Sequence, residues 1–191
     1  PRSWATWLLR TPQFEQNGLQ QLQEIIAQNY NHPSVVMWGI FSRLWTRGND
    51  VTPYLGKLNA AAHALDPSRP TVACSDQDGN INFITDLIVW RQDVGWRKGT
   101  TDDVTVWRDQ LQKGWSHLRS GICYGGSGFI GHKSYTAQAA PRANWMPEER
   151  QTHFHEQYAK NLQNDSLFWG TWINNMFDYG SVRRPYGVNG A

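Results

Sequence analysis

Short apolar runs alternate with longer amphipathic stretches along almost the whole chain, and this alternation constrains the fold more than any other feature. The plainest run is SVVMWGIF, residues 34–41, which is apolar with little interruption. A parallel strand has this pattern because helices cover both faces of a parallel sheet. Repeated strand–helix units are typical of α/β proteins. The sequence therefore predicts an α/β fold.

The boundaries of the runs predict six strands and four helices. The expected strands cover residues 4–9, 34–41, 70–75, 86–90, 121–125 and 168–177. The expected helices cover residues 12–30, 52–65, 102–118 and 147–161. A length of 191 residues predicts a single domain over residues 1–191. The alternation by itself does not decide between an open sheet and a barrel.

Composition excludes several classes of partner. The net charge is only +2 and no run of Lys or Arg is present, so we expect no nucleic-acid binding. No apolar stretch approaches a membrane span of about 20 residues, and the first residues lack a signal-peptide core, which leaves the compartment open. The two cysteines fit no zinc spacing, and no glycine-rich phosphate loop follows a strand. We expect no metal and no cofactor.

Six segments of the chain carry a family resemblance. They are QNYNHPSVVMWGIFSRLW (28–45), DPSRPTVACS (66–75), NFITDLIVWRQDVGWRKG (82–99), GICYGGSG (121–128), WMPEERQTHFHEQY (145–158) and FWGTWINNMFDYGS (168–181). Taken in order, these segments are similar to one enzyme family, the glycoside hydrolase family 2 catalytic domain of the β-galactosidase and β-glucuronidase branch. The resemblance implies a TIM-barrel-derived (β/α) fold, with strands 3 to 8 of the barrel in this chain. Function is then expected at the carboxyl ends of the strands.

Six of the eight βα units leave two strand edges, residues 4–9 and 168–177, next to the missing units. Unpaired edges favour association. We therefore expect an incomplete barrel that forms a homo-oligomer or pairs with a companion chain.

The resemblance places neither catalytic glutamate of the family in this chain. Retaining glycosidases use two carboxyl groups roughly 5 Å apart. Arg43 stands where the family carries its acid/base glutamate, and Cys123 stands where it carries the nucleophile. Arginine does not release its proton near neutral pH, so glycoside hydrolysis is not expected.

Other departures from the family also fall at strand ends. Ser42 and Asn174 replace an asparagine and a tryptophan, and the strand 6 loop carries two arginines and an aspartate in place of asparagine and tyrosines. This distribution indicates a rebuilt site, by engineering as our favoured hypothesis or by selection for a new ligand. The candidate ligand-binding residues are Trp7, Ser42, Arg43, Arg91, Asp93, Trp96, Arg97, Cys123, Asn174 and Asp178.

These residues admit more than one interpretation. Arg43, Arg91 and Arg97 form either an anion pocket or internal ion pairs with Asp93 and Asp178. Cys123 is either an activated thiol or a small buried residue. Trp96, in a loop with glycines, is expected to face a ligand.

The leading functional hypothesis is a non-hydrolytic, glycosidase-derived scaffold whose remodelled pocket binds a small molecule. The expected ligand is a small molecule or a sugar-like one, with an anion as one form of it. A new enzyme at the former glycosidase site and a fragment made for assembly are the alternatives.

Overall fold

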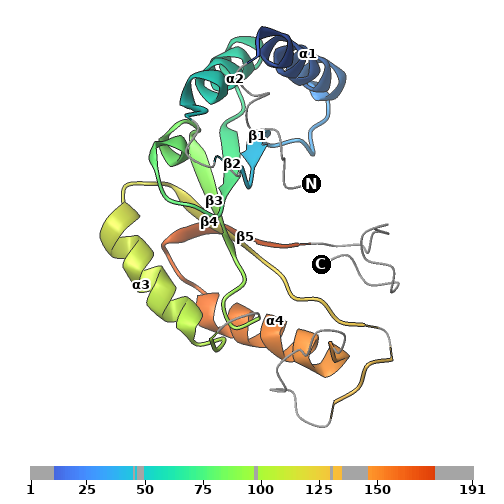
Figure 1. Ribbon diagram of the computed structural model, residues 1–191, viewed down its shortest axis with the longest axis vertical. Helices are drawn as coiled ribbons and strands as arrows, with labels where there is room; N and C mark the ends of the chain where they lie inside the picture. The colour runs from blue at the N-terminus through green and yellow to red at the C-terminus, as the bar shows by residue number, and fades with distance from the viewer. Residues whose placement is uncertain are drawn as a thin grey trace. The chain divides into compact units, whose positions relative to one another are not determined.

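The computed structural model describes residues 11–44, 46, 50–96, 99–129, 131–134 and 146–174. Within these ranges, five strands follow one another in chain order, β1-β2-β3-β4-β5 (Figure 1). They are β1 (Trp38–Ser42), β2 (Thr71–Ser75), β3 (Leu87–Gln92), β4 (Ser120–Tyr124) and β5 (Phe168–Ile173). The α/β class is confirmed. The sixth expected strand, residues 4–9, lies outside the described residues.

Four α-helices lie within the described ranges, as expected: one precedes β1 and the other three connect successive strands, except β2 and β3. They are α1 (Pro12–Asn29), α2 (Thr52–Leu65), α3 (Asp103–Trp115) and α4 (Glu148–Leu162), together with a short 3-10 helix, η2 (Asn80–Phe83), that the sequence pattern did not predict. The hydroxyl of Thr11 caps α1 by accepting from the amide of Phe14 at 3.4 Å. Proline in the first turn of α1 and α2 supports both starts, because the first amides of a helix have no partner within it.

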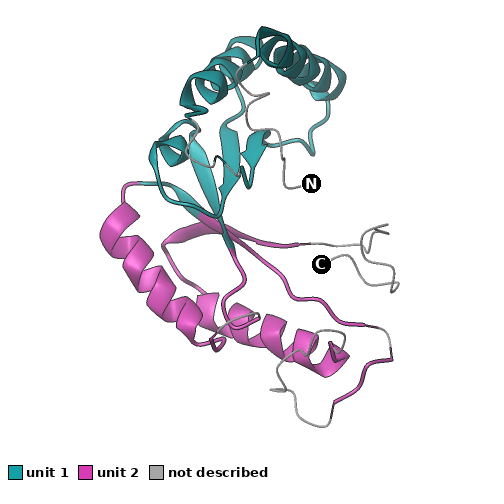
Figure 2. Cartoon of the chain, viewed as in Figure 1, with its two compact units in different colours: residues 1–91, 118–120 teal, residues 92–117, 121–191 magenta. Residues whose placement is uncertain are grey.

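The chain divides into two compact units (Figure 2). Unit 1 comprises residues 1–91 and 118–120, and unit 2 comprises residues 92–117 and 121–191.

Unit 1 contains the parallel ladder of β1, β2 and β3. Trp38 is opposite Thr71 in the first pair of strands, and Val72 is opposite Leu87 in the second. The register shifts between Gly39 and Phe41, so β1 carries an irregularity just before its end. The expected strand over residues 34–41 begins only at Trp38.

A buried carboxylate joins the start of β1 to the turn before β2. Asp66 is fully buried and accepts from the indole nitrogen of Trp38 at 3.0 Å, from Arg69 Nη1 at 2.6 Å and from the Ser68 amide at 3.0 Å. Arg69 also donates through Nε to the carbonyl of Val35 at 2.7 Å. This side-chain bond occupies a carbonyl of the expected strand, which accounts for its late start.

The hydroxyl of Ser68 also donates to Asp66 Oδ1 at 2.5 Å. This bond, together with those from Arg69, Trp38 and the Ser68 amide, holds the pKa of Asp66 well below its usual range, against the opposing effect of burial. A carboxyl whose pKa is lower in the folded than in the unfolded chain stabilises the fold above the unfolded value, near 4, and that contribution is lost as the pH falls through the folded pKa.

Replacement of Asp66 by asparagine is therefore expected to lower the free energy of unfolding at pH 7. The difference from the parent chain should shrink as the pH falls below about 4. Urea denaturation at several pH values measures this. Asp109→Asn is the matched control, because that carboxylate is 57% exposed in its ion pair with Arg108. Equal losses in the two variants would contradict the assignment.

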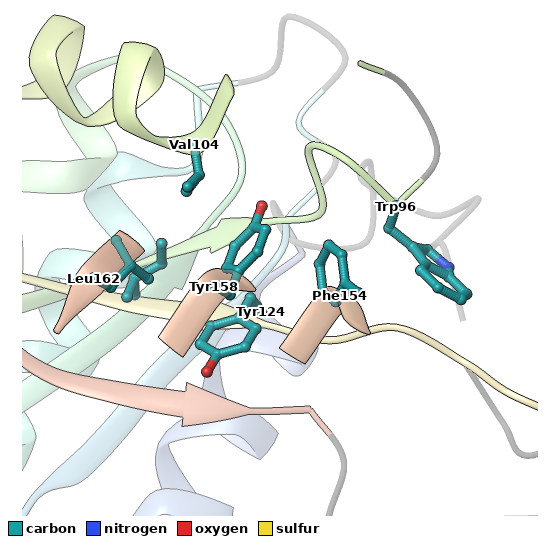
Figure 3. Close-up of a cluster of buried hydrophobic side chains, with 7 residues drawn as sticks. Trp96, Val104, Tyr124, Phe154, Tyr158 and Leu162 are labelled. Carbon is teal, nitrogen blue, oxygen red and sulfur yellow. The ribbon is translucent and has the colours of Figure 1, made fainter. Parts of the chain in front are cut away.

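Unit 2 has a core of aromatic and aliphatic side chains (Figure 3). The buried members are Trp96, Val104, Ile122, Tyr124, Phe154, Tyr158 and Leu162. Alternate residues of β4 supply Ile122 and Tyr124, while α4 supplies Phe154, Tyr158 and Leu162 at helical spacing. The Tyr158 hydroxyl donates to the carbonyl of Val94 at 2.6 Å, which ties α4 to the segment after β3.

Strand β5 leaves large apolar side chains exposed. Trp169, Trp172 and Ile173 are 38%, 37% and 57% exposed, and β5 is last in the strand order. The association expected through this strand stays a prediction. No helix within the described ranges is long and apolar enough to cross a bilayer.

Candidate functional site

The first part of the candidate site lies in unit 1, where the chain leaves β1. Ser42 ends the strand and is exposed. Arg43 follows with φ +50, a left-handed backbone conformation that is unusual for a side chain of this kind. The Arg43 amide donates to the carbonyl of Cys74 at 2.8 Å, so the residue after β1 still pairs with β2. The strained position is thus tied to the sheet.

The Arg43 side chain forms an ion pair with an aspartate that the sequence reasoning did not select. Arg43 Nε lies 3.1 Å from Asp76 Oδ2, and the two side chains are 47% and 37% exposed. The predicted internal partners were Asp93 and Asp178. Asp76 is the first residue after β2. Its place directly after a strand that neighbours β1 is the sequence signal that could have identified it as the partner of Arg43.

The loop after β2 also contacts the backbone next to Arg43. Gln77 donates from Nε2 to the carbonyl of Leu44 at 2.5 Å. The carbonyl of Gln77 accepts from Ser75 Oγ at 3.0 Å and from Asn82 Nδ2 at 2.9 Å. Ser75 and Asn82 are both 1% exposed. A buried polar network therefore fixes this loop. The contact with Leu44 could not be predicted from the sequence, because the two residues are 33 positions apart.

The second part of the candidate site lies in unit 2 and contains Trp96. This ring was expected to face a ligand, but it is 3% exposed and packs edge-on against Phe154 with ring centroids 5.5 Å apart. A Cβ on Gly126 would lie 2.8 Å from the Trp96 ring, so glycine at 126 lets the indole approach the backbone. The Arg150 guanidinium lies over the Trp96 ring, 5.2 Å from its centroid. The structure gives Trp96 a packing role.

Cys123 is half-buried and forms no disulfide. Its neighbours Ile122 and Tyr124 are 0% and 5% exposed and belong to the core that α4 covers. Successive side chains of a strand point to opposite faces. Cys123 therefore lies on the face of β4 that is turned away from α4. Activation of its thiol stays a prediction.

Asn174 follows β5 and pairs with the end of β4. Its amide donates to the carbonyl of Tyr124 at 2.9 Å, and a Cβ on Gly125 would meet the Asn174 carbonyl oxygen at 2.1 Å. Glycine at 125 is thus required for the close approach of these two strand ends. Two candidate residues of unit 2 therefore lie at the ends of neighbouring strands, Cys123 in β4 and Asn174 directly after β5.

A buried histidine of α4 was not selected from the sequence. His155 lies against Tyr124 with ring centroids 5.7 Å apart, and its Nδ1 is buried without a hydrogen-bond partner among the described residues. Burial lowers the pKa of His155, and a hydrogen bond to the Gly126 carbonyl opposes that shift. His155 thus packs against Tyr124 and the backbone of Gly126, in the segment that follows Cys123.

The remaining predicted residues are described in part or not at all. Arg91 and Asp93 are half-buried at and after the end of β3, and the Asp93 carbonyl accepts from the Trp96 amide at 3.0 Å. Trp7, Arg97 and Asp178 lie outside the described residues. Convergence of the three arginines stays a prediction. Within the described ranges no three His, Cys, Asp or Glu side chains gather as metal ligands.

The order of strands and the residues at their carboxyl ends can be compared with known proteins. The family model described as "Glycosyl hydrolases family 2, TIM barrel domain" matches residues 4–191. The chain belongs to this family. Its described strands and helices are accordingly a fragment of a TIM barrel.

Relatives in the family are named as β-glucuronidases. A β-glucuronidase of Bacteroides fragilis is 40% identical over 176 residues, which cover 91% of this chain and 25% of the relative. The human β-glucuronidase is 32% identical over 83 residues, covering 41% of this chain and 12% of that enzyme. The chain thus spans about a quarter of the length of the Bacteroides relative and less of the human one.

A solved structure supports the same relation. The crystal structure titled as an FMN-binding β-glucuronidase from Faecalibacterium prausnitzii superposes with a TM-score of 0.83 at 27% identity, covering 95% of this chain and 29% of that one. A β-glucuronidase of Bacteroides uniformis, at 22% identity and a TM-score of 0.79, shares the fold. The glycoside hydrolase family 2 resemblance is confirmed over nearly the whole chain.

Proposed function

We propose that this family 2 barrel fragment belongs to a protein that binds glycosides without hydrolysing them. The observation that carries the proposal is Arg43 at the end of β1, where the family resemblance expects the acid/base glutamate. Its guanidinium is held by Asp76 at 3.1 Å. An arginine at this position offers hydrogen-bond donors to a ligand and no transferable proton.

The placement of the glutamates supports the same proposal. The chain has five glutamates, Glu15, Glu24, Glu148, Glu149 and Glu156. All five lie in α1 or α4 and none lies at the end of a strand. A retaining mechanism needs two carboxyl groups close together at the strand ends. No glutamate is placed to substitute for those lost at Arg43 and Cys123.

The names of the relatives indicate which ligands to try. β-Glucuronidase is the name of the Bacteroides relative, so β-linked glucosides and glucuronides are the first class to test. We expect methyl β-D-glucuronide, methyl β-D-glucoside or both to raise the melting temperature of the chain by mass action. At a free ligand concentration about 100 times Kd, the rise should be roughly 5 °C or more for a chain of this size.

Differential scanning calorimetry measures the rise, with sorbitol at the same concentration as the control for a general polyol effect. A melting temperature that responds to the glycosides no more than to sorbitol would contradict glycoside binding.

A further inference from the structure

The strained backbone at Arg43 is held from two sides within unit 1. A left-handed conformation is unfavourable for a residue with a side chain, and it persists where the surroundings fix it. On one side the Arg43 amide donates to Cys74, and on the other Gln77 donates to the carbonyl of Leu44. The peptide unit that sets the direction of the Arg43 side chain is thus bracketed by two hydrogen bonds.

Gln77 is itself fixed by buried groups. Its carbonyl accepts two hydrogen bonds, from Ser75 Oγ and Asn82 Nδ2, and its amide donates to Ser75 Oγ at 3.4 Å. Ser75 and Asn82 are almost fully buried, so their positions are set by the fold. Because the backbone of Gln77 is held in this way, its side-chain amide reaches the carbonyl of Leu44 from a fixed position.

The ion pair with Asp76 orients the guanidinium without occupying all of it. Arginine has five N–H donors in a planar fork, and the contact with Asp76 is made through Nε. The two terminal nitrogens of such a fork match the two oxygens of a carboxylate. The side chain is 47% exposed, which leaves room for a ligand to reach it.

We propose that Gln77 is a positioning residue that holds Arg43 in the geometry to bind the carboxylate of an anionic glycoside. This inference rests on the proposed function and names its ligand class and the residues that select it. A simple internal ion pair between Arg43 and Asp76 would need neither the strained backbone nor the clamp on Leu44.

Isothermal titration of the chain with two matched ligands tests the proposal. Methyl β-D-glucuronide carries a carboxylate where methyl β-D-glucoside carries a hydroxymethyl group, and the two are otherwise identical. The glucuronide is expected to bind about tenfold more tightly, because one charge-assisted hydrogen bond lowers Kd by about that factor. Arg43→Ala and Gln77→Met should each remove this preference. Gln77→Met keeps the approximate volume of the side chain but has no donor for Leu44.

A glutamine in unit 2 provides the matched control. Gln151 donates from Nε2 to the carbonyl of Gly126 at 2.7 Å, which is the same kind of bond. Gln151→Met should lower the melting temperature about as much as Gln77→Met and keep the tenfold preference. Should Gln77→Met fail to fold, Gln77→Glu removes the donor with the same shape and takes its place.

The outcomes separate this inference from the proposed function. Loss of the preference in Arg43→Ala and Gln77→Met, with its retention in Gln151→Met, would support the positioning role. Equal affinity of the parent chain for both glycosides, or an unchanged preference in Gln77→Met, would overturn it and leave glycoside binding intact. Binding of neither glycoside would overturn both.

Discussion

Incubation of the chain with 4-nitrophenyl β-D-glucuronide is expected to release nitrophenol no faster than buffer alone. The positions that the family resemblance assigns to the two catalytic glutamates carry Arg43 and Cys123. General acid–base catalysis alone contributes roughly 10²–10⁴ in rate, and a covalent route also needs the nucleophilic carboxylate. Loss of both removes protonation of the leaving group and the covalent intermediate together. Absorbance of nitrophenolate over several hours measures the rate.

The control for this experiment is the variant Cys123→Ala. If Cys123 has no catalytic role, the variant and the parent chain give the same background rate. Nitrophenol release that persists through repeated purification and disappears in Cys123→Ala would show that the thiol has taken over the chemistry. The non-hydrolytic proposal would then be replaced by that of a new enzyme at the same position.

Replacement of Phe154 by alanine is expected to lower the free energy of unfolding of unit 2 by about 3–5 kcal/mol. Phe154 is 1% exposed and lies at the centre of the aromatic core (Figure 3). Its ring centroid is 4.4 Å from that of Tyr158, 5.5 Å from that of Trp96 and 6.3 Å from that of Tyr124. Truncation removes the contacts with all three rings and leaves a cavity among side chains that cannot collapse into it.

Phe83→Ala is the matched control for the aromatic core, because it deletes the same atoms at a side chain that is 48% exposed. Its effect should stay within about 0.5–1 kcal/mol. Urea denaturation followed by tryptophan fluorescence compares the two midpoints. Similar midpoints in both variants would mean that Phe154 is not central to the stability of unit 2.

The helices and strands were largely predictable because their signals are local. The helix expected over residues 52–65 is α2, Thr52–Leu65, with proline near its start and Asp66-Pro67 after its end. Strand ends were less accurate where a distant side chain competes for the backbone. Arg69 takes the carbonyl of Val35, and β1 accordingly starts at Trp38.

The candidate site was predictable in position but not in its contacts. Resemblance to the family located Arg43 and Cys123 at strand ends, since family patterns preserve position along the chain. The partner of Arg43 depended on which loop lies beside β1, and that is a property of the sheet register. Trp96 illustrates the opposite error. A loop with glycines suggested an accessible ring, whereas Gly126 of a distant segment provides the space in which that ring is buried.

The left-handed backbone at Arg43 affects which substitutions at this position would stabilise the chain. Glycine adopts φ +50 without steric penalty, while a residue with a Cβ is less stable there by about 1 kcal/mol. Selection for stability alone would therefore move position 43 toward glycine and erase the guanidinium. Natural sequences commonly sit below their stability optimum where a side chain has a task to perform. Under the role proposed for Arg43, stability and ligand selectivity make opposite demands on position 43, because a glycine there would remove the strain and the guanidinium together.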